Sequence, residues 1–356
     1  MKKIAIIGIV GVPANYGGFE TLVENIIGEN ASEDVEYTVF CSSKIYEEHR
    51  ESYKGAKLKH IGLDANDIQS TLYDIMATLR TSNKYDIALV LGVSGCLFLP
   101  FFRLWFRNKL IVNIDGLEHK RGKWGTFAKW FLKQSEAMAL RFADVIIADN
   151  KGIQDYVTDT YHKPSALIAY GGDHVKRQVP DEKTAEILKQ YGVEKGNYAI
   201  SVCRIEPENN CHVILEAFAK TDRKLVYIGN WEKNEYGKNL KRRYSGFKNI
   251  NIHTPEYDLD TLYALRSNAA MYIHGHSAGG TNPSLVEAMF FGKPILAFDV
   301  VYNRATTDGK AYYFKDCKQL EELLKRQGLD GEVMKEVAQR KYTWKRIASQ
   351  YEDLYN

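Results

Sequence analysis

The chain has 356 residues, enough for two domains of ordinary size, and its 45% hydrophobic content excludes a disordered or fibrous protein. The 48 basic and 45 acidic residues nearly cancel to a net charge of +3, so no nucleic acid is expected as a partner. The five cysteines are widely spaced without a CxxC pair, which predicts reduced thiols and no zinc site.

The first residues superficially resemble a signal peptide. Met1-Lys2-Lys3 precede the apolar run Ile4–Val10, but a Gly/Pro turn and an amphipathic helix follow in place of a cleavage site. We therefore interpret the run as a buried strand. Ile87–Phe102 is the nearest approach to a membrane span, and glycines and a proline interrupt it. A cytoplasmic protein, soluble or peripheral on the inner face of the cell membrane, is expected.

Short apolar runs alternate with helical stretches along most of the chain, which is typical of parallel sheets built from βαβ units. A charged, proline-containing segment, His174–Gly196, separates two such series. The expected helices include Phe19–Gly28, Ile68–Ser82, Thr126–Phe142 and Lys183–Tyr191, with further helical segments from Lys318 to Tyr355. The expected strands are Lys3–Ile9, Tyr37–Cys41, Leu58–Leu63, Ile87–Val93, Leu110–Asp115, Val145–Ala148, Ala166–Ala169, Tyr198–Cys203, Lys224–Ile228, Ile250–His253, Met271–His274 and Pro294–Phe298.

This organisation predicts an α/β fold of two Rossmann-like domains that face a cleft, with ligand sites at the carboxyl ends of the strands. The boundaries expected are an N-terminal domain over 1–174, a linker over 175–195, a C-terminal domain over 196–340 and a closing helix over 341–356.

The first loop, Gly11–Glu20, joins the first strand to the first helix. It is not a GxGxxG dinucleotide fingerprint, because the adjacent glycines Gly17 and Gly18 come too late. A Gly-Gly pair that opens a helix still allows the backbone to approach a ligand phosphate or sugar. A flexible turn without a ligand is the alternative.

Polar residues appear where the fifth expected strand ends, in Asn113–His119. Asp115 is placed to act as a base on a sugar hydroxyl, and Glu118 and His119 are weaker candidates for that role. Asp-Gly is also a common turn dipeptide, so a plain turn remains open.

The stretch His274–Met289 combines a strand end, a glycine turn and a helix start, with Asn282 as N-cap and Pro283 as first helical residue. The exposed N–H groups of a helix N-terminus suit a phosphate, and Thr281 and Ser284 add hydroxyl donors. Glu287, about one turn into the helix, is placed to accept hydrogen bonds from sugar hydroxyls. This predicts a nucleotide-sugar site; an ordinary turn with a solvated glutamate is the alternative.

Three further motifs have competing interpretations. Arg204, after the first strand of the second series, suits a diphosphate, although a lone arginine is more often a surface ion-pair partner. Asp258-Leu-Asp260 matches a metal-binding DxD, but we favour an N-cap with first-turn acids. His274 and His276 form an HxH without a third ligand nearby, so hydrogen bonding beside phosphate is favoured over a metal site.

Aromatic and cationic residues interleave in Phe98–Arg107 and again in Lys120–Lys133. This pattern suits an anionic bilayer surface. The alternative is that the aromatic residues pack on the sheet and the lysines are solvated.

Taken together, the late Gly-Gly loop, Arg204 and the Gly279–Met289 stretch resemble a retaining GT-B glycosyltransferase of family GT4, over nearly the whole chain. Within that family the sequence is most similar to bacterial capsule and cell-wall enzymes with a DUF1972-type N-terminal domain, many of which are rhamnosyltransferases. The stretches that carry this closer similarity are Tyr16–Thr21, Asn113–Glu118, Glu206–Asn210 and Gly279–Glu287, and Tyr342–Tyr351 is similar to the helix that crosses back to the N-terminal domain.

The resemblance implies a nucleotide-sugar donor held by the C-terminal domain, an acceptor held by the N-terminal domain, and retention without an obligatory metal or other cofactor. Glu287 would hold the ribose and Arg204 the diphosphate. Asp115 stands where the family often has an active-site histidine and is the candidate catalytic base. The acceptor-side candidates are Glu20, Glu118 and His119, and the donor-binding candidates are Gly17, Gly18, Arg204, Asn209, His276, Gly279, Gly280, Thr281, Asn282, Ser284 and Glu287.

The sequence departs from the family pattern at two positions. Gly279 replaces the first of the paired glutamates, which usually contacts donor sugar hydroxyls, and Asn209 replaces the usual phosphate-binding lysine. The first change disfavours a common hexose donor, and the second leaves Arg204 and the helix N-terminus to neutralise the diphosphate.

The function expected from sequence is therefore transfer of L-rhamnose from dTDP-L-rhamnose to a lipid-linked saccharide during capsule or cell-wall polysaccharide assembly. The alternatives are a UDP-glucose- or UDP-galactose-dependent transferase of the same fold, a nucleotide-sugar epimerase, and a non-catalytic nucleotide-sugar-binding protein. The missing fingerprint disfavours a dehydrogenase.

Overall fold

A computed structural model describes residues 1–14, 17–29, 34–46, 48–65, 69–122 and 124–356. The chain divides into two compact units, the first made of Met1–Tyr170 with Trp344–Asn356 and the second of Gly171–Thr343. Of the residues and ranges named above, Asn15, Tyr16, Ile68 and Lys123 lie outside the described residues.

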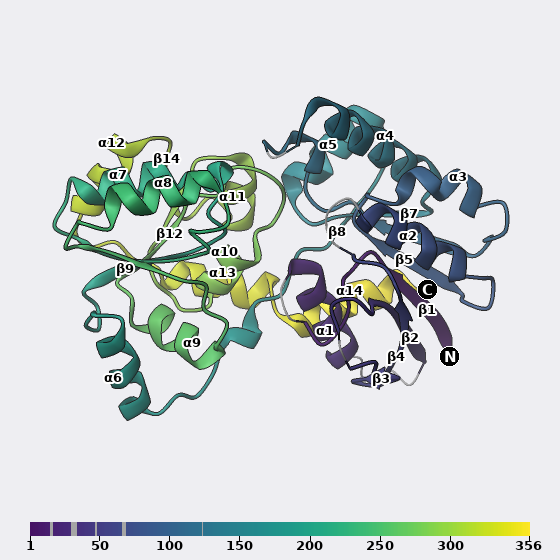
Figure 1. Cartoon of the computed structure of the whole chain (residues 1–356), viewed down its shortest axis with the longest axis horizontal. Coiled ribbons are helices and arrows are strands. Elements are labelled where there is room, and N and C mark those ends of the chain that lie inside the picture. The colour runs from purple at the N-terminus through teal and green to yellow at the C-terminus, as the bar shows by residue number, and fades with distance from the viewer. Residues whose placement is uncertain (15–16, 30–33, 47, 66–68, 123) are drawn as a thin grey trace. The chain divides into compact units, whose positions relative to one another are not determined.

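The first unit is an eight-stranded sheet in the order β3-β4-β2-β1-β5-β6-β7-β8, in which only the short β3 runs antiparallel to its neighbour (Figure 1). Its strands are β1 (Lys2–Ile7), β2 (Val35–Ser42), β3 (Ser52–Tyr53), β4 (Ala56–Ile61), β5 (Ile87–Leu91), β6 (Lys109–Asn113), β7 (Val145–Ala148) and β8 (Ala166–Leu167). Its helices are α1 (Gly18–Glu29), α2 (Gln69–Arg80), α3 (Leu99–Phe102), α4 (Thr126–Phe142), α5 (Lys151–Tyr161) and α14 (Trp344–Asp353), with short 3-10 turns η1 (Cys96–Phe98) and η2 (Glu118–Lys120).

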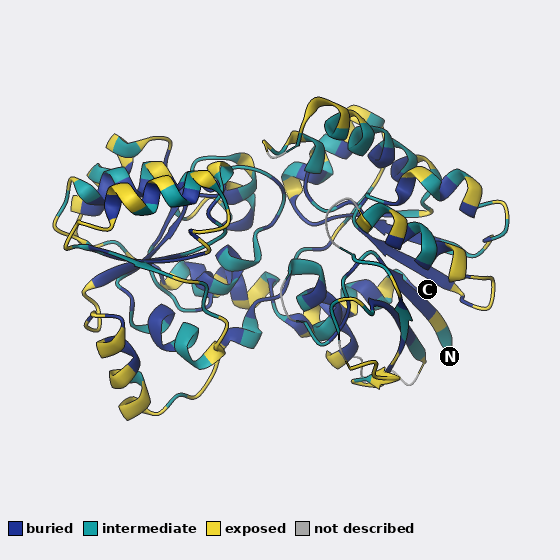
Figure 2. Ribbon diagram, in the orientation of Figure 1, coloured by how far each residue is buried: buried dark blue, intermediate teal, exposed yellow. Residues whose placement is uncertain are grey.

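One face of this sheet is covered by helices from both ends of the chain. The α1 and α14 helices pack against each other, and Val23 of α1 and Tyr351 of α14 belong to the same buried cluster as Ile4 and Ile6 of β1. The central strands are buried along most of their length (Figure 2), as parallel strands between helical layers must be.

The second unit is a six-stranded parallel sheet in the order β11-β10-β9-β12-β13-β14. Its strands are β9 (Tyr198–Val202), β10 (Lys224–Ile228), β11 (Ile250–His253), β12 (Met271–His274), β13 (Ile295–Phe298) and β14 (Tyr312–Phe314). Its helices are α6 (Asp181–Gln190), α7 (Cys211–Ala219), α8 (Glu235–Tyr244), α9 (Leu259–Asn268), α10 (Pro283–Met289), α11 (Val301–Thr306), α12 (Cys317–Lys325) and α13 (Glu332–Lys341), with 3-10 turns η3 (Asp173–Val175) and η4 (Pro207–Asn209).

The segment 175–195, the expected linker, is grouped with the second compact unit. Its helix α6 packs against α9, and Arg177 and Lys183 both pair with Asp260. Polar composition suggested a connecting segment, whereas these long-range ion pairs fix it to the domain that follows.

In both sheets the strand order reverses beside the first strand of the unit. In the first unit β1 lies between β2 and β5, and in the second β9 lies between β10 and β12. Ligands of open α/β sheets bind outside the carboxyl ends of the strands at such switch points. Ligand sites are therefore expected at the loops after β1, β9 and β12, and the two predicted Rossmann-like units are confirmed.

Candidate active site

In the second unit, the loop after β9 and the loop after β12 are tied together by hydrogen bonds. The Nδ2 of Asn210 donates to the Gly275 carbonyl at 2.8 Å, and both the backbone N–H and the hydroxyl of Ser277 donate to the Glu208 carbonyl at 2.8 Å. Only glycine fits at 275, because a Cβ there would lie 2.1 Å from the carbonyl oxygen of Asn209. The two loops therefore form one braced edge of the sheet.

Asn209 is part of this brace. Its side chain is 3% exposed; its amide donates to the Arg204 carbonyl at 2.6 Å, and its Oδ1 lies 2.7 Å from Nδ1 of His276. This asparagine therefore positions the Arg204 backbone and the His276 ring, while its contact with a donor stays a prediction. The Arg204 side chain is 36% exposed and lies 3.8 Å from Glu206, too far for a strong hydrogen bond, so its guanidinium is accessible to an anion.

The predicted start of α10 is confirmed. Asn282 is the N-cap, its Oδ1 accepts from the Ser284 N–H at 3.0 Å, and Pro283 is the first helical residue. Thr281 is 5% exposed, and Gly279 has φ 89°, a conformation that glycine adopts without strain. Gly280 and Ser284 are partly exposed on either side of this turn.

Glu287 of α10 is held by two residues that the sequence did not indicate. Its Oε2 lies 2.7 Å from Nη2 of Arg266, and its Oε1 lies 3.4 Å from Nε2 of His174. Burial acts to raise the pKa of Glu287, but Arg266 and His174 outweigh burial and hold that pKa below its ordinary value. Glu287 is therefore ionised at neutral pH and acts as a hydrogen-bond acceptor.

The aspartate motif and the histidine motif differ in their surroundings. Asp258 is the N-cap of α9, accepting from the Thr261 N–H at 2.9 Å, which confirms the capping interpretation of the DxD. His274 is 2% exposed and burial lowers its pKa to about 3, so its ring is neutral. Within the described residues, no three side chains of the metal-ligating types lie close enough to hold an ion.

In the first unit, Glu20 braces the loop that follows β1. Its Oε1 accepts from the Val10 N–H at 2.9 Å, and its Oε2 lies beside Gly17, whose φ of 129° favours glycine at that position. Gly18 is the first residue of α1. Burial raises the pKa of Glu20, and Asp115 adds to that effect. The structure thus places the Glu20 and Asp115 carboxyl groups close enough to influence each other.

Asp115 has φ 58°, in the left-handed region that residues other than glycine rarely adopt. Its N–H donates to Oδ1 of Asn113 at 3.0 Å, and Nδ2 of Asn113 donates to the Tyr351 hydroxyl at 2.9 Å. A strained aspartate held at the end of a central strand is consistent with a functional position.

The other two acceptor-side candidates face different partners. Glu118 pairs with Arg121 at 2.8 Å, and Nδ1 of His119 lies 3.0 Å from the buried Glu136. Burial acts to raise the pKa of Glu136, but hydrogen bonds from His119 and two tyrosines lower it to about 2. The contact of His119 thus anchors the segment after β6 onto α4, whereas that of Glu118 lies within the segment, and the roles of both residues toward an acceptor stay predictions.

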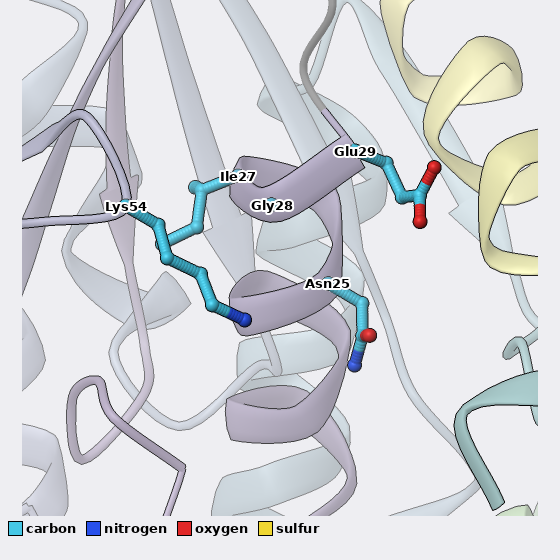
Figure 3. A pocket seen from close by; sticks show the side chains of 5 residues that line it. All are labelled: Asn25, Ile27, Gly28, Glu29 and Lys54. Carbon is cyan, nitrogen blue, oxygen red and sulfur yellow. The ribbon is translucent and has the colours of Figure 1, made fainter. Parts of the chain in front are cut away.

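A surface hollow of about 450 Å³ lies at the opposite end of α1 from Gly17 (Figure 3). Asn25, Gly28 and Lys54 are among the residues that line it, and it includes none of the residues predicted to bind donor or acceptor. It therefore has no part in the site described above.

Comparisons with known proteins agree with this architecture. Residues 1–173 match the family model described as a domain of unknown function, DUF1972, and residues 183–342 match the model described as Glycosyl transferases group 1. No curated protein matches the sequence closely enough to count as a relative.

Among solved structures, sucrose-phosphate synthase from Thermosynechococcus elongatus superposes with a TM-score of 0.81 at 16% identity, covering 100% of this chain and 98% of that one. HepE of Anabaena, in complex with UDP-glucose, has a TM-score of 0.74 at 14% identity, covering 99% of both chains. A UDP-N-acetylglucosamine 2-epimerase described as putative, from Listeria monocytogenes, has a TM-score of 0.61 at 14% identity, covering 98% of this chain and 94% of that one.

The fold and the family matches define a class: the chain is a glycosyltransferase with the GT-B fold.

Proposed function

We propose that this glycosyltransferase transfers L-rhamnose, with retention, from dTDP-L-rhamnose to a lipid-linked saccharide in the synthesis of capsule or cell-wall polysaccharide. The observation that carries the donor assignment is the ionised Glu287, fixed by Arg266 beside the braced loops after β9 and β12. A fixed carboxylate accepts hydrogen bonds from sugar hydroxyls, and the accessible Arg204 suits the diphosphate.

In the proposed reaction an acceptor hydroxyl oxygen bonds to the anomeric carbon while the bond from that carbon to the diphosphate breaks. Asp115 takes the hydroxyl proton, and Arg204 stabilises the negative charge on the leaving dTDP. The proposed reaction requires no metal ion, because the Arg204 guanidinium and the backbone N–H groups at the start of α10 stabilise the negative charge of the diphosphate.

The proposal of a rhamnose donor is supported by Gly279. This position supplies no carboxylate, and its φ of 89° disfavours any side chain there, so the site has one acceptor fewer for sugar hydroxyls. A 6-deoxy sugar has one hydroxyl fewer than glucose and needs fewer acceptors. The structural likeness to a protein solved with UDP-glucose makes a UDP-hexose the second candidate.

A nucleotide-release screen tests donor and reaction together. The purified enzyme is offered dTDP-L-rhamnose, UDP-glucose, UDP-galactose or UDP-N-acetylglucosamine, each with and without membrane-derived lipid-linked acceptors. Release of dTDP from dTDP-L-rhamnose only when acceptor is present is the expected result. Release only from a UDP-sugar would overturn the rhamnose assignment, and conversion of a donor without acceptor would favour an epimerase.

The lipid-linked acceptor requires access to a membrane, and we propose that the first unit docks on the inner face of the cell membrane. Among the described residues, no helix has the length and apolar character needed to cross a bilayer. An apolar surface is nevertheless exposed on the adjacent elements η1, α3 and α4. It consists of Leu97, Phe101, Leu104, Phe127 and Trp130, and Leu104 and Phe127 are 73% and 76% exposed.

Cations accompany this apolar surface: Arg107 follows α3, Lys120 precedes α4, and both side chains are exposed. Aromatic residues that enter the interface and cations that meet anionic headgroups act together in peripheral binding. Phe102 and Phe106 of the same stretch are buried, as the alternative interpretation expects, whereas the five apolar residues of this surface are exposed and support the docking proposal.

Vesicle sedimentation tests the docking. The enzyme is expected to sediment with phosphatidylglycerol vesicles and much less with phosphatidylcholine vesicles. The double variant Phe127→Ser/Trp130→Ser should lose most of that binding, whereas Phe247→Ser/Leu259→Ser, which changes exposed apolar residues of the second unit, should retain it. Equal binding by both double variants would refute the assignment of this surface.

A further inference from the structure

The Arg266 side chain is a buried cation beside the proposed donor site. Arg266 lies in the last turn of α9 and is 5% exposed, and among the described residues its ion-pair partner is Glu287, at 2.7 Å. Its buried Nε has no hydrogen-bond partner among the described residues. The guanidinium therefore depends on Glu287 for compensation of its charge.

A buried ion pair of this kind is weak evidence for a role in stability, because well-packed apolar residues often stabilise a fold equally well. Glu287 keeps 17% of its side chain exposed while Arg266 is nearly closed off. Glu287 is thus the less buried partner of the pair, and Arg266 is the more buried one. This is the arrangement of a side chain that acts on a ligand through its neighbour.

The carboxylate is also fixed from a second direction. His174 of η3 approaches Oε1, and its position follows from Gly172, whose backbone packs so closely on α10 that a Cβ would lie 3.2 Å from the Glu287 nitrogen. A carboxylate has about four acceptor positions, so Arg266 and His174 leave about two of them for ligand hydroxyls.

We propose that Arg266 is a positioning residue for nucleotide-sugar binding, which keeps the Glu287 carboxylate ionised and oriented toward the hydroxyls of the donor. The inference rests on the proposed function of Glu287. It assigns no contact between Arg266 and the donor itself.

Without the Arg266 guanidinium, burial becomes the main influence on the pKa of Glu287 and raises it. The carboxyl group then keeps its proton to a higher pH than in the parent protein. The other groups that face it are His174 and the hydroxyl of Tyr272 on β12, whose pKa burial raises well beyond neutrality. His174 pairs with the Glu287 carboxylate, and the variant His174→Gln removes its imidazole while it keeps a hydrogen-bond donor.

The experiment measures dTDP and UDP affinity by calorimetry between pH 5.5 and 8.5, in a His174→Gln background. Arg266→Met should weaken binding about tenfold or more at pH 7, the usual effect of losing a charged hydrogen-bond acceptor, and affinity should recover as the pH rises. Arg266→Lys should retain most of the affinity with a flat profile. The control Arg340→Met, which removes an exposed ion pair with Asp308, should leave binding unchanged.

A double-mutant cycle separates this role from the alternatives. Glu287→Gln should bind weakly at every pH, and Arg266→Met/Glu287→Gln should bind no more weakly than Glu287→Gln alone. Additive losses, or a pH-independent loss in Arg266→Met, would overturn the positioning role. Failure of the parent protein to bind either nucleotide, or full affinity in Glu287→Gln, would instead refute the proposed donor site.

Discussion

The pair of Glu287 and Arg266 determines which substitutions are informative at this site. An alanine at 287 leaves the 5%-exposed guanidinium of Arg266 without its carboxylate. Removing one partner of a buried pair costs about 3 kcal/mol, far more than the pair itself contributes. Loss of donor binding in Glu287→Ala would therefore be mixed with loss of stability, whereas Glu287→Gln keeps an acceptor for the arginine.

The two Glu287 variants should lose different amounts of unfolding free energy, and the loss should depend on pH. The folded-state pKa of Glu287 is depressed, so its ionisation contributes stability that is fully present above the ordinary carboxyl pKa and is lost as the pH falls through the folded-state value. At pH 7 we expect Glu287→Ala to lose about 3 kcal/mol of unfolding free energy and Glu287→Gln clearly less.

Urea unfolding at pH 7 and pH 4 measures this difference. Trp231 is the one tryptophan of the sequence between 171 and 343, so a parent protein that keeps only this tryptophan reports on the second unit alone. The deficit of Glu287→Gln should shrink at pH 4. If the loss of unfolding free energy were the same at both pH values, the charge of the Glu287 carboxylate would not contribute to stability.

At the scale of elements, the apolar runs of the sequence predicted most strands well. β7, β10, β11 and β12 have the predicted bounds: β11 alternates apolar and polar residues, and the other three are short, mainly apolar runs. β3 and β14 were missed: β3 has two residues and β14 three, too few to show any periodicity. The α6 helix was predicted within two residues, but its attachment to α9 was not.

The candidate site shows the same division between local and distant signals. The Asn282 cap was visible because it depends on neighbours in sequence, whereas the contact of Asn209 with His276 joins two loops and was not. The Arg266 and His174 contacts with Glu287 were not, because these residues lie on three separate elements that only the folded sheet brings together. Arg266 did carry a signal, as a charged residue following the apolar Ala264 and Leu265 near the end of a helix.

At the scale of the whole molecule, the chain enters the first unit twice. After the second unit ends at Thr343, α14 adds Trp344, Ile347 and Tyr351 to the core of the first sheet. Tyr351 also reaches the end of β6, where its hydroxyl accepts from Asn113, and Asn113 in turn accepts from the Asp115 N–H. The last helix of the chain thus supports the proposed catalytic base through one buried amide.

Tyr351→Phe tests whether this support matters for catalysis. The variant removes the acceptor of a buried amide that is 1% exposed, so we expect a loss of about 1 kcal/mol in unfolding free energy and, as the Asp115 loop loosens, a several-fold lower kcat. The KM for the donor should not change, because Tyr351 belongs to the first unit and the proposed donor contacts of Arg204 and Glu287 to the second. Tyr355→Phe is the matched control, since its hydroxyl meets Tyr37 instead of Asn113 and its loss should spare kcat. Equal kcat values in the two variants would show that α14 has a structural role only and does not support the catalytic base.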